Sequence, residues 1–136
     1  MNAPSYDIVQ ILEQLGESSD FDDLVYASSL FIGKEPSLPI NAVTIFDTPG
    51  FAPDLNLTVQ GYEYPSVQIR VRNKTYINGY NLIQRIKTSL HGLGQITVNG
   101  TLYSVIYCSS DPALLDWDDN GNPRFVCNFN IQRRTS

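Results

Sequence analysis

The chain has 136 residues, 42% of them hydrophobic and 17% charged, which suits one domain with its own core. No apolar run reaches the about 18 residues of a membrane span, and no basic leader precedes an apolar stretch. We therefore expect no transmembrane segment, no secretory signal and no membrane partner. The net charge of −5 is unlike that of most nucleic-acid-binding proteins, which are basic.

Charge is divided unevenly along the chain. Residues 1–63 contain ten acids and one base, whereas residues 64–136 contain four acids and eight bases, so the halves carry −9 and +4. If folding places the halves on different surfaces, the subunit is electrically polar. Copies of a polar subunit can pack head to tail, and such a contact generates a ring when its rotation closes. If folding interleaves the halves, the charges mix and this polarity disappears.

The N-terminal half predicts a helix, two short strands and a long loop. A helix over about 5–15 is predicted by an apolar stripe at helical spacing, formed by Ile8, Ile11, Leu12 and Leu15. Alternating apolar residues predict strands at 30–33 and 42–47. The two prolines and the glycine that follow predict a loop over about 48–63, because proline cannot donate to a strand ladder. A loop this long is typical of a segment with a function of its own or one ordered by a partner.

The stretch 64–109 is the unit around which the chain is organised. In its first strand Val67, Ile69 and Val71 alternate with polar residues, so the strand has an apolar face and an arginine-bearing face. A helix over 75–91 follows, with apolar residues three and four apart, and it ends at His91-Gly92. Asn99-Gly100 then lies between two alternating runs, which indicates a β-hairpin with a type I′ turn.

A turn-rich stretch from Asp111 to Pro123 and a strand over 124–134 complete the chain. These elements predict a single domain, 1–136, of the α+β class. We expect a mainly antiparallel sheet of four to six strands, with the N-terminal helix and helix 75–91 packed on one face.

Catalytic chemistry finds little support in the sequence. His91 is the only histidine, and its place at a helix end favours a structural role. Cys108 and Cys127 fall in predicted strands, where we interpret them as buried free thiols. There is no nucleophile elbow and no phosphate-binding loop. We therefore predict a protein that is not an enzyme and uses no cofactor.

One turn resembles the start of a calcium loop. Asp116, Asp118 and Asn120 supply oxygen atoms at alternate positions, and Gly121 follows. The twelfth position of such a loop is a bidentate Glu, but here it is Cys127 in an apolar strand. A polar turn is the favoured interpretation. The alternatives are a small calcium-binding module, or a metal-dependent hydrolase that uses these carboxylates together with Asp111.

Several sequence motifs, taken in their order along the chain, resemble those of one protein family. They are Tyr64-Pro-x-Val-Gln-x-Arg-Val-Arg, the helix ending in Leu90-His91-Gly92, Asn99-Gly100 with Tyr103, and the run from Asp119 to Arg134. Leu30-Phe-Ile-Gly and the segment Val43 to Asp54 also fit the pattern. Together, over about residues 30–134, they resemble the small minor capsid protein family of tailed bacteriophages and prophages of Gram-positive hosts. Members of this family are similar to tail terminators and head–tail joining proteins.

The resemblance implies a virion morphogenesis protein at the head–tail junction, assembled in the cytoplasm of the host bacterium. A tail terminator is a small subunit that closes a hexameric ring on the tail tube, stops its growth and presents a surface to the head connector. The implied partners are further copies of the chain, the tail tube protein, the head connector or stopper protein, and DNA that passes through the lumen without specific recognition. A head-completion protein, or stopper, on the capsid side is the alternative.

The resemblance brings no catalytic residues with it. The residues that we expect at interfaces with other subunits or partners are the arginines of strand 64–72, the apolar residues of the long loop and the C-terminal arginines: Arg70, Arg72, Phe51, Leu55, Leu57, Arg133 and Arg134.

Overall fold

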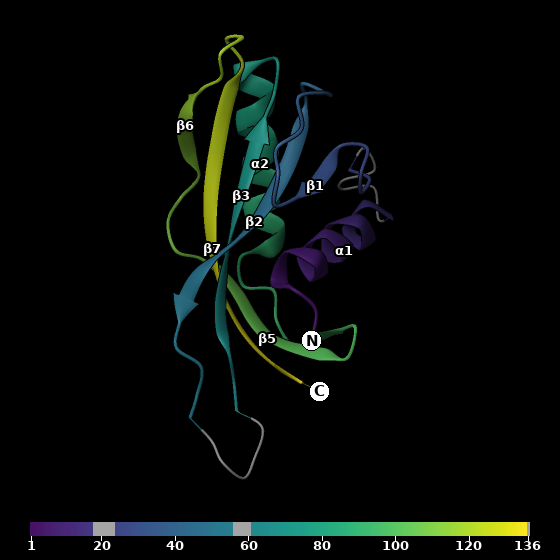
Figure 1. Ribbon diagram of the computed structural model, residues 1–136, viewed down its shortest axis with the longest axis vertical. Helices are drawn as coiled ribbons and strands as arrows, with labels where there is room; N and C mark the ends of the chain where they lie inside the picture. Colours follow the sequence, from purple (N-terminus) through teal and green to yellow (C-terminus); the bar gives the residue numbers. More distant parts are fainter. Residues whose placement is uncertain (18–23, 56–60, 136) are drawn as a thin grey trace.

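The computed structural model describes residues 1–17, 24–55 and 61–135 (Figure 1). Its helices and strands follow in the order α1 (Pro4–Glu17), β1 (Leu30–Ile32), β2 (Ala42–Phe51), β3 (Tyr64–Arg72), α2 (Tyr76–Leu90), β4 (Ile96–Val98), β5 (Thr101–Cys108), β6 (Ala113–Trp117) and β7 (Pro123–Thr135). None of the described helices is both long and apolar enough to cross a membrane.

The described strands form one seven-stranded sheet in the order β1-β2-β3-β7-β5-β4, with β6 paired to the first half of β7. β1 runs parallel to β2, and the other pairings between named strands are antiparallel, so the sheet is mixed. The long strand β7 lies in the centre because it pairs with β3 along one edge and with β5 and β6 along the other. The predicted α+β class is confirmed.

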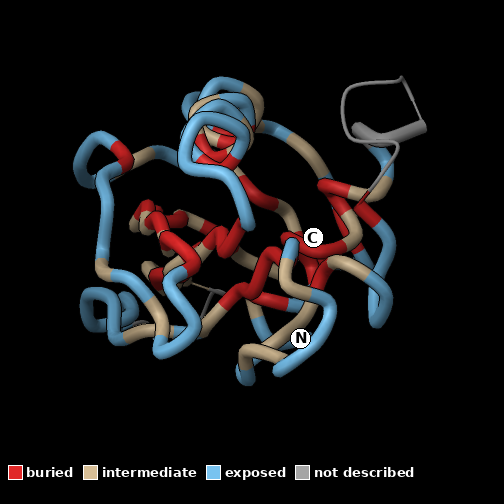
Figure 2. The backbone as a smooth tube through the Cα atoms, turned by 90° about the horizontal axis from the view of Figure 1, so that it is seen from above, coloured by how far each residue is buried: buried red, intermediate tan, exposed pale blue. Residues whose placement is uncertain are grey.

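The core forms where the alternating strands meet the two helices. Val71, Ile69 and Val67 of β3 lie opposite Phe125, Cys127 and Phe129 of β7, and all six side chains are buried. Both helices add to the same hydrophobic cluster, with Ile8, Ile11 and Leu12 from α1 and Ile83, Ile86 and Leu90 from α2. Seen from above, α2 appears nearly end-on and turns exposed segments outwards, while buried segments gather in the middle of the molecule (Figure 2).

The turn between β4 and β5 has the conformation that its sequence predicts. Asn99 and Gly100 both have positive φ, 51° and 75°. A type I′ turn needs positive φ at both central positions, and Asn and Gly tolerate it best. The turn is also anchored, because Asn99 Nδ2 donates to Asp7 Oδ1 over 2.9 Å and so joins the hairpin to α1.

The predicted loop over 48–63 is wrong in its first part, because β2 continues to Phe51. The register shifts between Thr48 and Phe51, so Pro49 and Gly50 fall in a bulge where no ladder bond is required of the proline. Gly50 is needed there, since a Cβ atom would lie 2.0 Å from the carbonyl oxygen of Tyr64. The bulge therefore allows the strand to continue through Pro49 and Gly50, residues that ordinarily interrupt a strand.

A second correction concerns the turn-rich stretch between Asp111 and Pro123, in which no strand is predicted. It contains strand β6, Ala113–Trp117. β6 is short and mostly exposed, so no alternation between buried and exposed residues marks it in the sequence. Pairing with β7, which is a tertiary contact, is what makes it a strand. The turn that follows agrees with the prediction, with Gly121 at a φ of 79°.

Candidate assembly surfaces

The side of the sheet opposite the core side of β3 and β7 is polar, and we call it the polar face. It is built from Ser66, Gln68 and Arg70 of β3 with Asn128 and Asn130 of β7. Ser66 donates to Asn130 over 2.7 Å, and Gln68 donates to Asn128 over 3.1 Å. These cross-strand bonds follow directly from the register, which places each donor opposite its acceptor. The side-chain oxygens of both asparagines are thus bonded within the subunit.

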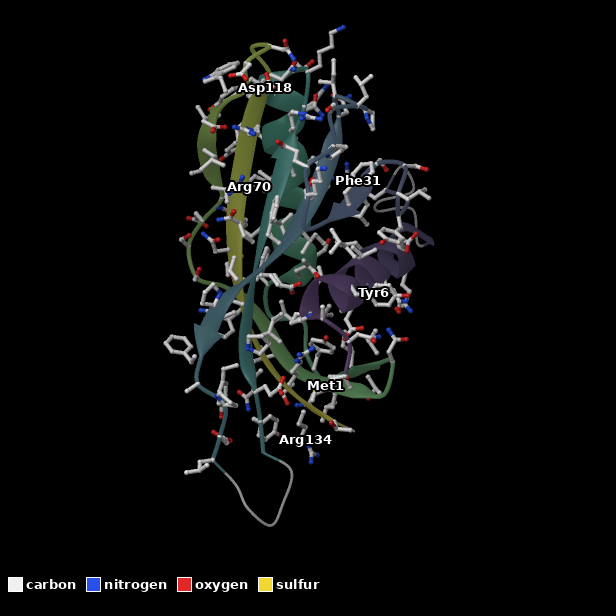
Figure 3. All side chains as sticks on the ribbon, in the orientation of Figure 1. Met1, Tyr6, Phe31, Arg70, Asp118 and Arg134 are labelled. Atoms are coloured by element: carbon white, nitrogen blue, oxygen red, sulfur yellow. The ribbon has the colours of Figure 1, made fainter. Side chains whose placement is uncertain are left out.

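Arg70 is the cation of the polar face, and neighbouring side chains hold it in place. Its Nε donates to Gln68 Oε1 over 2.7 Å, and its guanidinium lies 4.8 Å from the centre of the Phe46 ring. Stacking on an aromatic ring is a favourable contact for a guanidinium. Arg70 is half-buried, and the side-chain view labels it along the sheet (Figure 3).

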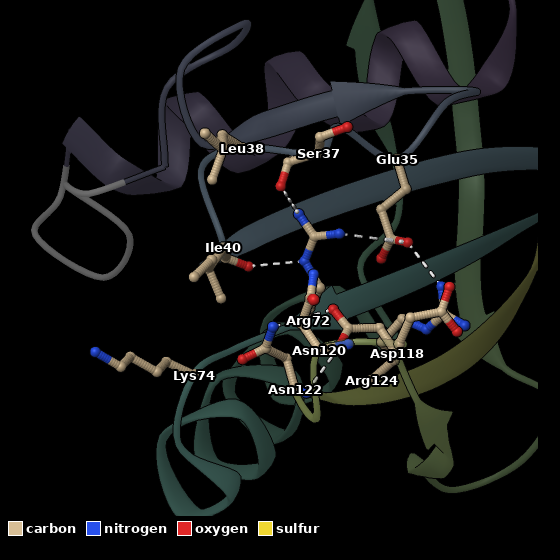
Figure 4. A pocket seen from close by; sticks show the side chains of 11 residues that line it. Glu35, Ser37, Leu38, Ile40, Arg72, Lys74, Asp118, Asn120, Asn122 and Arg124 are labelled. Carbon is tan, nitrogen blue, oxygen red and sulfur yellow. Dashed lines mark hydrogen bonds and ion pairs between the residues drawn. The ribbon is translucent and has the colours of Figure 1, made fainter.

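Arg72 has a different role from the one expected for it. Only 6% of it is exposed, and its guanidinium donates to the backbone carbonyls of Pro36, Ser37, Pro39 and Ile40 (Figure 4). It therefore organises the loop between β1 and β2. A guanidinium with these internal partners has little left to offer a neighbouring subunit.

A charged cluster surrounds Arg72 at this end of the sheet. Arg124 donates to both carboxylate oxygens of Asp116 over 2.6 and 2.7 Å and to Glu35 over 2.8 Å, and Glu35 lies 3.7 Å from Arg72. The cluster borders an open cavity of about 500 Å³. The cavity has no net formal charge to attract a ligand, because its three acids and three bases balance: Glu35, Asp118 and Asp119 with Arg72, Lys74 and Arg124.

The carboxylates proposed as calcium ligands already accept hydrogen bonds within the protein. Asp118 Oδ1 accepts from the backbone N–H groups of Asn120 and Asn122 over 2.9 and 2.8 Å, and Oδ2 accepts from the Asn122 side chain over 3.1 Å. These bonds lower the pKa of Asp118. Asp116 is held by Arg124, so Asp116, Asp118 and Asn120 do not converge on a shared point. Among the described residues, no three His, Cys, Asp or Glu side chains are grouped as metal ligands.

The end of the β2–β3 hairpin projects beyond the rest of the molecule (Figure 1). We call its described residues, 49–55 and 61–63, the arm. Phe51 is 70% exposed and Leu55 is 95% exposed, so neither finds cover within its own subunit. Asp54 stiffens the arm, since its carboxylate accepts from Tyr64 Oη over 3.0 Å and from Tyr62 N over 3.4 Å. Leu57, also expected at an interface, lies outside the described residues.

The C-terminal arginines lie near the base of the arm, but only one of them is near the surface. Arg133 is 7% exposed and binds Glu63 over 3.1 Å, the carbonyl of Asn2 over 2.9 Å and Tyr103 Oη over 3.3 Å. Arg134 is half-buried and its guanidinium lies 5.6 Å from the centre of the Tyr62 ring. The predicted interface residues therefore do not form one site.

His91 and the cysteines have structural partners. His91 Nδ1 accepts a hydrogen bond from the backbone N–H of Cys108 over 2.9 Å, which joins the end of α2 to β5. The sulfur atoms of Cys108 and Cys127 lie 3.5 Å apart as free thiols. Burial raises the pKa of both thiols, so neither is an activated nucleophile at neutral pH.

Sequence reasoning missed one surface, which we call the aromatic patch. It consists of Tyr76 and Tyr80 from α2 with Leu114 and Trp117 from β6, all of them exposed, around the buried ring of Phe125. The rings of Tyr76 and Trp117 stack at 6.1 Å, and Tyr76 also meets Phe125 edge-on at 4.9 Å. The run Ala113-Leu-Leu-Asp-Trp117 was the available signal, but only the pairing of β6 with β7 brings it beside α2.

Comparison with known proteins agrees with this architecture. The model of a family described as bacteriophage tail terminator protein matches residues 19–135, and the chain belongs to this family. Among solved structures, a chain from the virion of a native gene transfer agent particle is similar, with a TM-score of 0.68 and 11% sequence identity. The similarity covers 97% of this chain and 95% of that one, and at such low identity it shows the fold alone. No curated protein sequence matches the chain.

Family membership confirms the resemblance to tail terminators that the motifs indicate. The protein is a structural component of a phage virion, and a structural family of this kind implies a protein that is not an enzyme. The arm, the polar face and the aromatic patch are therefore candidate surfaces for assembly rather than for catalysis.

Proposed function

We propose that this protein ends the tail of the phage. Copies assemble as a hexameric ring on the last layer of the tail tube, stop its growth and present a surface to the head connector. Assembly takes place in the cytoplasm of the host bacterium, and the ring then lies in the neck of the virion. The family match supports termination, and the arm is the structural observation that carries assembly, because its two apolar side chains need a cover that their own subunit does not supply.

The polar face supports a role in lining the lumen through which DNA passes. The side-chain oxygens of Asn128 and Asn130 already accept hydrogen bonds within the subunit, so they are not free acceptors for base edges. Arg70 is a fixed cation that attracts phosphate without sequence preference. Such a surface favours passage of DNA over tight or specific binding.

The proposal is tested by adding the purified full chain to assembled and to growing tail tubes. We expect electron microscopy to show rings at tube ends only, and the tubes to stop lengthening. A variant with Leu38→Ser, which alters an exposed leucine away from the arm, should cap tubes as the wild type does. Binding to isolated head connectors but not to tubes would make the protein a stopper. A protein that binds neither would contradict both roles.

A further inference from the structure

Two thiols from different strands meet beside an open cavity at the end of α2. Cys108 is the last residue of β5 and Cys127 lies in β7, and their sulfur atoms are 3.5 Å apart. We propose that these two cysteines form a modification site, a dithiol that a small disulfide such as oxidised glutathione converts reversibly into a Cys108–Cys127 disulfide. This chemistry goes beyond the proposed role at the tail and does not require it.

The fold brings the two cysteines to the same side of the sheet. The register pairs Cys108 with Phe129, and Cys127 lies two residues before Phe129, so both of these β7 side chains point the same way. A disulfide bond is about 2.05 Å long, so the sulfur atoms must approach by about 1.5 Å. Because β5 ends at Cys108, this movement disturbs little of the ladder between β5 and β7.

The two thiols differ in their access to a dissolved reagent. An open cavity of about 290 Å³ is lined by Cys108 together with Lys87, His91 and residues 109–111. Cys108 is half-buried, whereas only 1% of Cys127 is exposed. A reagent in the cavity therefore reacts first with Cys108, and Cys127 serves as the second thiol.

The oxidation consists of two thiol–disulfide exchanges. Cys108 gives up its proton, and its sulfur attacks one sulfur of the reagent, whose S–S bond breaks and releases one reagent thiol with that proton. The Cys127 sulfur then attacks the Cys108 sulfur of the mixed disulfide, and the second reagent thiol leaves with the Cys127 proton. The protein is oxidised by two electrons and loses two hydrogen atoms, and one reagent disulfide is reduced to two thiols. Because the second exchange is intramolecular and starts from 3.5 Å, the mixed disulfide should not accumulate.

The new bond ties β5 to β7 and closes the loop 108–127, which contains β6 and the turn after it. A closed loop restricts the unfolded chain, so the oxidised protein should be the more stable form. Protein thiols stay reduced in the cytoplasm and are oxidised in extracellular surroundings. We therefore expect thiols during assembly and a disulfide in the released virion, and this setting alone rests on the proposed function.

The rate of oxidation should rise with pH, because the thiolate is the attacking species. Burial is the largest cause that raises the pKa of both thiols. Around Cys108, the charge of Lys87 lowers the pKa of the thiol and the charge of Asp111 raises it, while His91 lines the same cavity. We expect oxidation to become about tenfold faster from about pH 7 to about pH 8, as the thiolate fraction grows. A rate that did not change with pH would contradict attack by a thiolate.

The first experiment treats the full wild-type chain with oxidised glutathione at about pH 8. Remaining thiols are then blocked with N-ethylmaleimide in urea, and the intact chain is weighed by mass spectrometry. We expect a chain that has lost two hydrogen atoms and carries no maleimide, a peptide map that joins Cys108 to Cys127, and full reversal by dithiothreitol. Thiols still blocked by maleimide after a day, a stable glutathione adduct, or a disulfide between two chains would each overturn the proposal.

Single substitutions test the order of the two exchanges. Cys127→Ala should keep one glutathione on Cys108, because no second thiol displaces it. Cys108→Ala should react at least about tenfold more slowly, because Cys127 is buried. In urea both variants should react at the same rate, which is the control for intrinsic reactivity. Equal rates in the folded variants would show that Cys108 is not the first thiol to react, and the wild-type measurement does not depend on how either variant folds.

The oxidised and reduced chains are then compared for stability. We expect oxidation to raise Tm by about 5 °C or more and to slow amide hydrogen exchange in β6, with exchange in α1 as the control that stays unchanged. A lower Tm would show that the bond strains the fold and would overturn the proposal. None of these measurements involves tail tubes. Failure here therefore leaves the proposed function standing, and failure to cap tubes leaves the disulfide standing.

Discussion

Among single residues, Tyr103 is a buried polar group whose hydroxyl is hydrogen-bonded to two other elements of the fold. It is fully buried, donates its hydroxyl hydrogen to Asp7 on α1, and accepts from Arg133 of β7 over 3.3 Å. Burial, followed by the hydrogen bond to Asp7, raises the pKa of Tyr103 far above its ordinary range. The phenol is therefore a permanent donor, and it joins α1, β5 and β7 around one point.

Removal of this hydroxyl in Tyr103→Phe should lower the free energy of unfolding by about 1–3 kcal/mol, because buried Asp7 loses a donor that water cannot replace. Urea denaturation at neutral pH measures the loss. Tyr107→Phe is the matched control on the same strand, and because Tyr107 is exposed we expect a change below about 0.5 kcal/mol. Equal losses in the two variants would show that the buried hydroxyl has no special role.

At the scale of elements, the attachment of β6 depends on one ion pair as well as on its ladder. Arg124 holds Asp116 through both carboxylate oxygens, across the bulge that separates Leu114 from Asp116 in the pairing of β6 with β7. The hydrogen bond from Arg124 is the largest cause that lowers the pKa of Asp116. Because Asp116 is protonated more easily in the unfolded chain, the pair stabilises the fold at neutral pH and loses its effect in acid.

This pH dependence can be measured with the variant Asp116→Asn. The pair should contribute about 0.5–1 kcal/mol at pH 7, since solvent screens a partly exposed salt bridge. The contribution is complete above the ordinary Asp pKa of about 4 and is lost as pH falls through the lowered pKa of the folded protein. The difference in stability between wild type and variant should therefore shrink as pH falls below about 4. A difference that stayed constant with pH would rule out the charge as its cause.

At the scale of the whole molecule, the arm is separable from the core. Its apolar residues Phe51 and Leu55 are mostly exposed and lie outside the hydrophobic cluster, so the core and the proposed assembly surface are different parts of the chain. The chain thereby keeps a closed core of its own while it presents apolar surface to a partner.

Replacement of residues 53–61 by Asn-Gly should test this separation. We expect the free energy of unfolding to change by less than about 1 kcal/mol, because a shorter hairpin loop costs little and none of the described residues removed belongs to the hydrophobic cluster. Self-association and tube capping should both be lost. Circular dichroism during urea unfolding and sedimentation velocity are the two measurements. A large loss of stability would show that the arm is part of the fold itself.

The sequence by itself determined what depends on near neighbours along the chain. Alternation predicted the inward residues of β3 and β7, helical spacing predicted α2, and Asn99-Gly100 predicted the turn between β4 and β5. These patterns are reliable because side-chain direction repeats every two residues in a strand and every 3.6 in a helix, whatever lies across the sheet. The same patterns, taken in order, resemble a minor capsid protein family that is similar to tail terminators, and the family match confirms the likeness to tail terminators.

Only the tertiary structure decided which distant segments meet. It placed β7 between β3 and β5, made a strand of β6, and turned Arg72 inward onto the carbonyls of the β1–β2 loop. A charged residue at the end of a strand has the same local pattern whether it faces solvent or a loop from elsewhere in the chain. The arm and the aromatic patch were likewise decided by the tertiary structure. Whether a side chain is exposed depends on all the segments that pack near it and not on that residue alone.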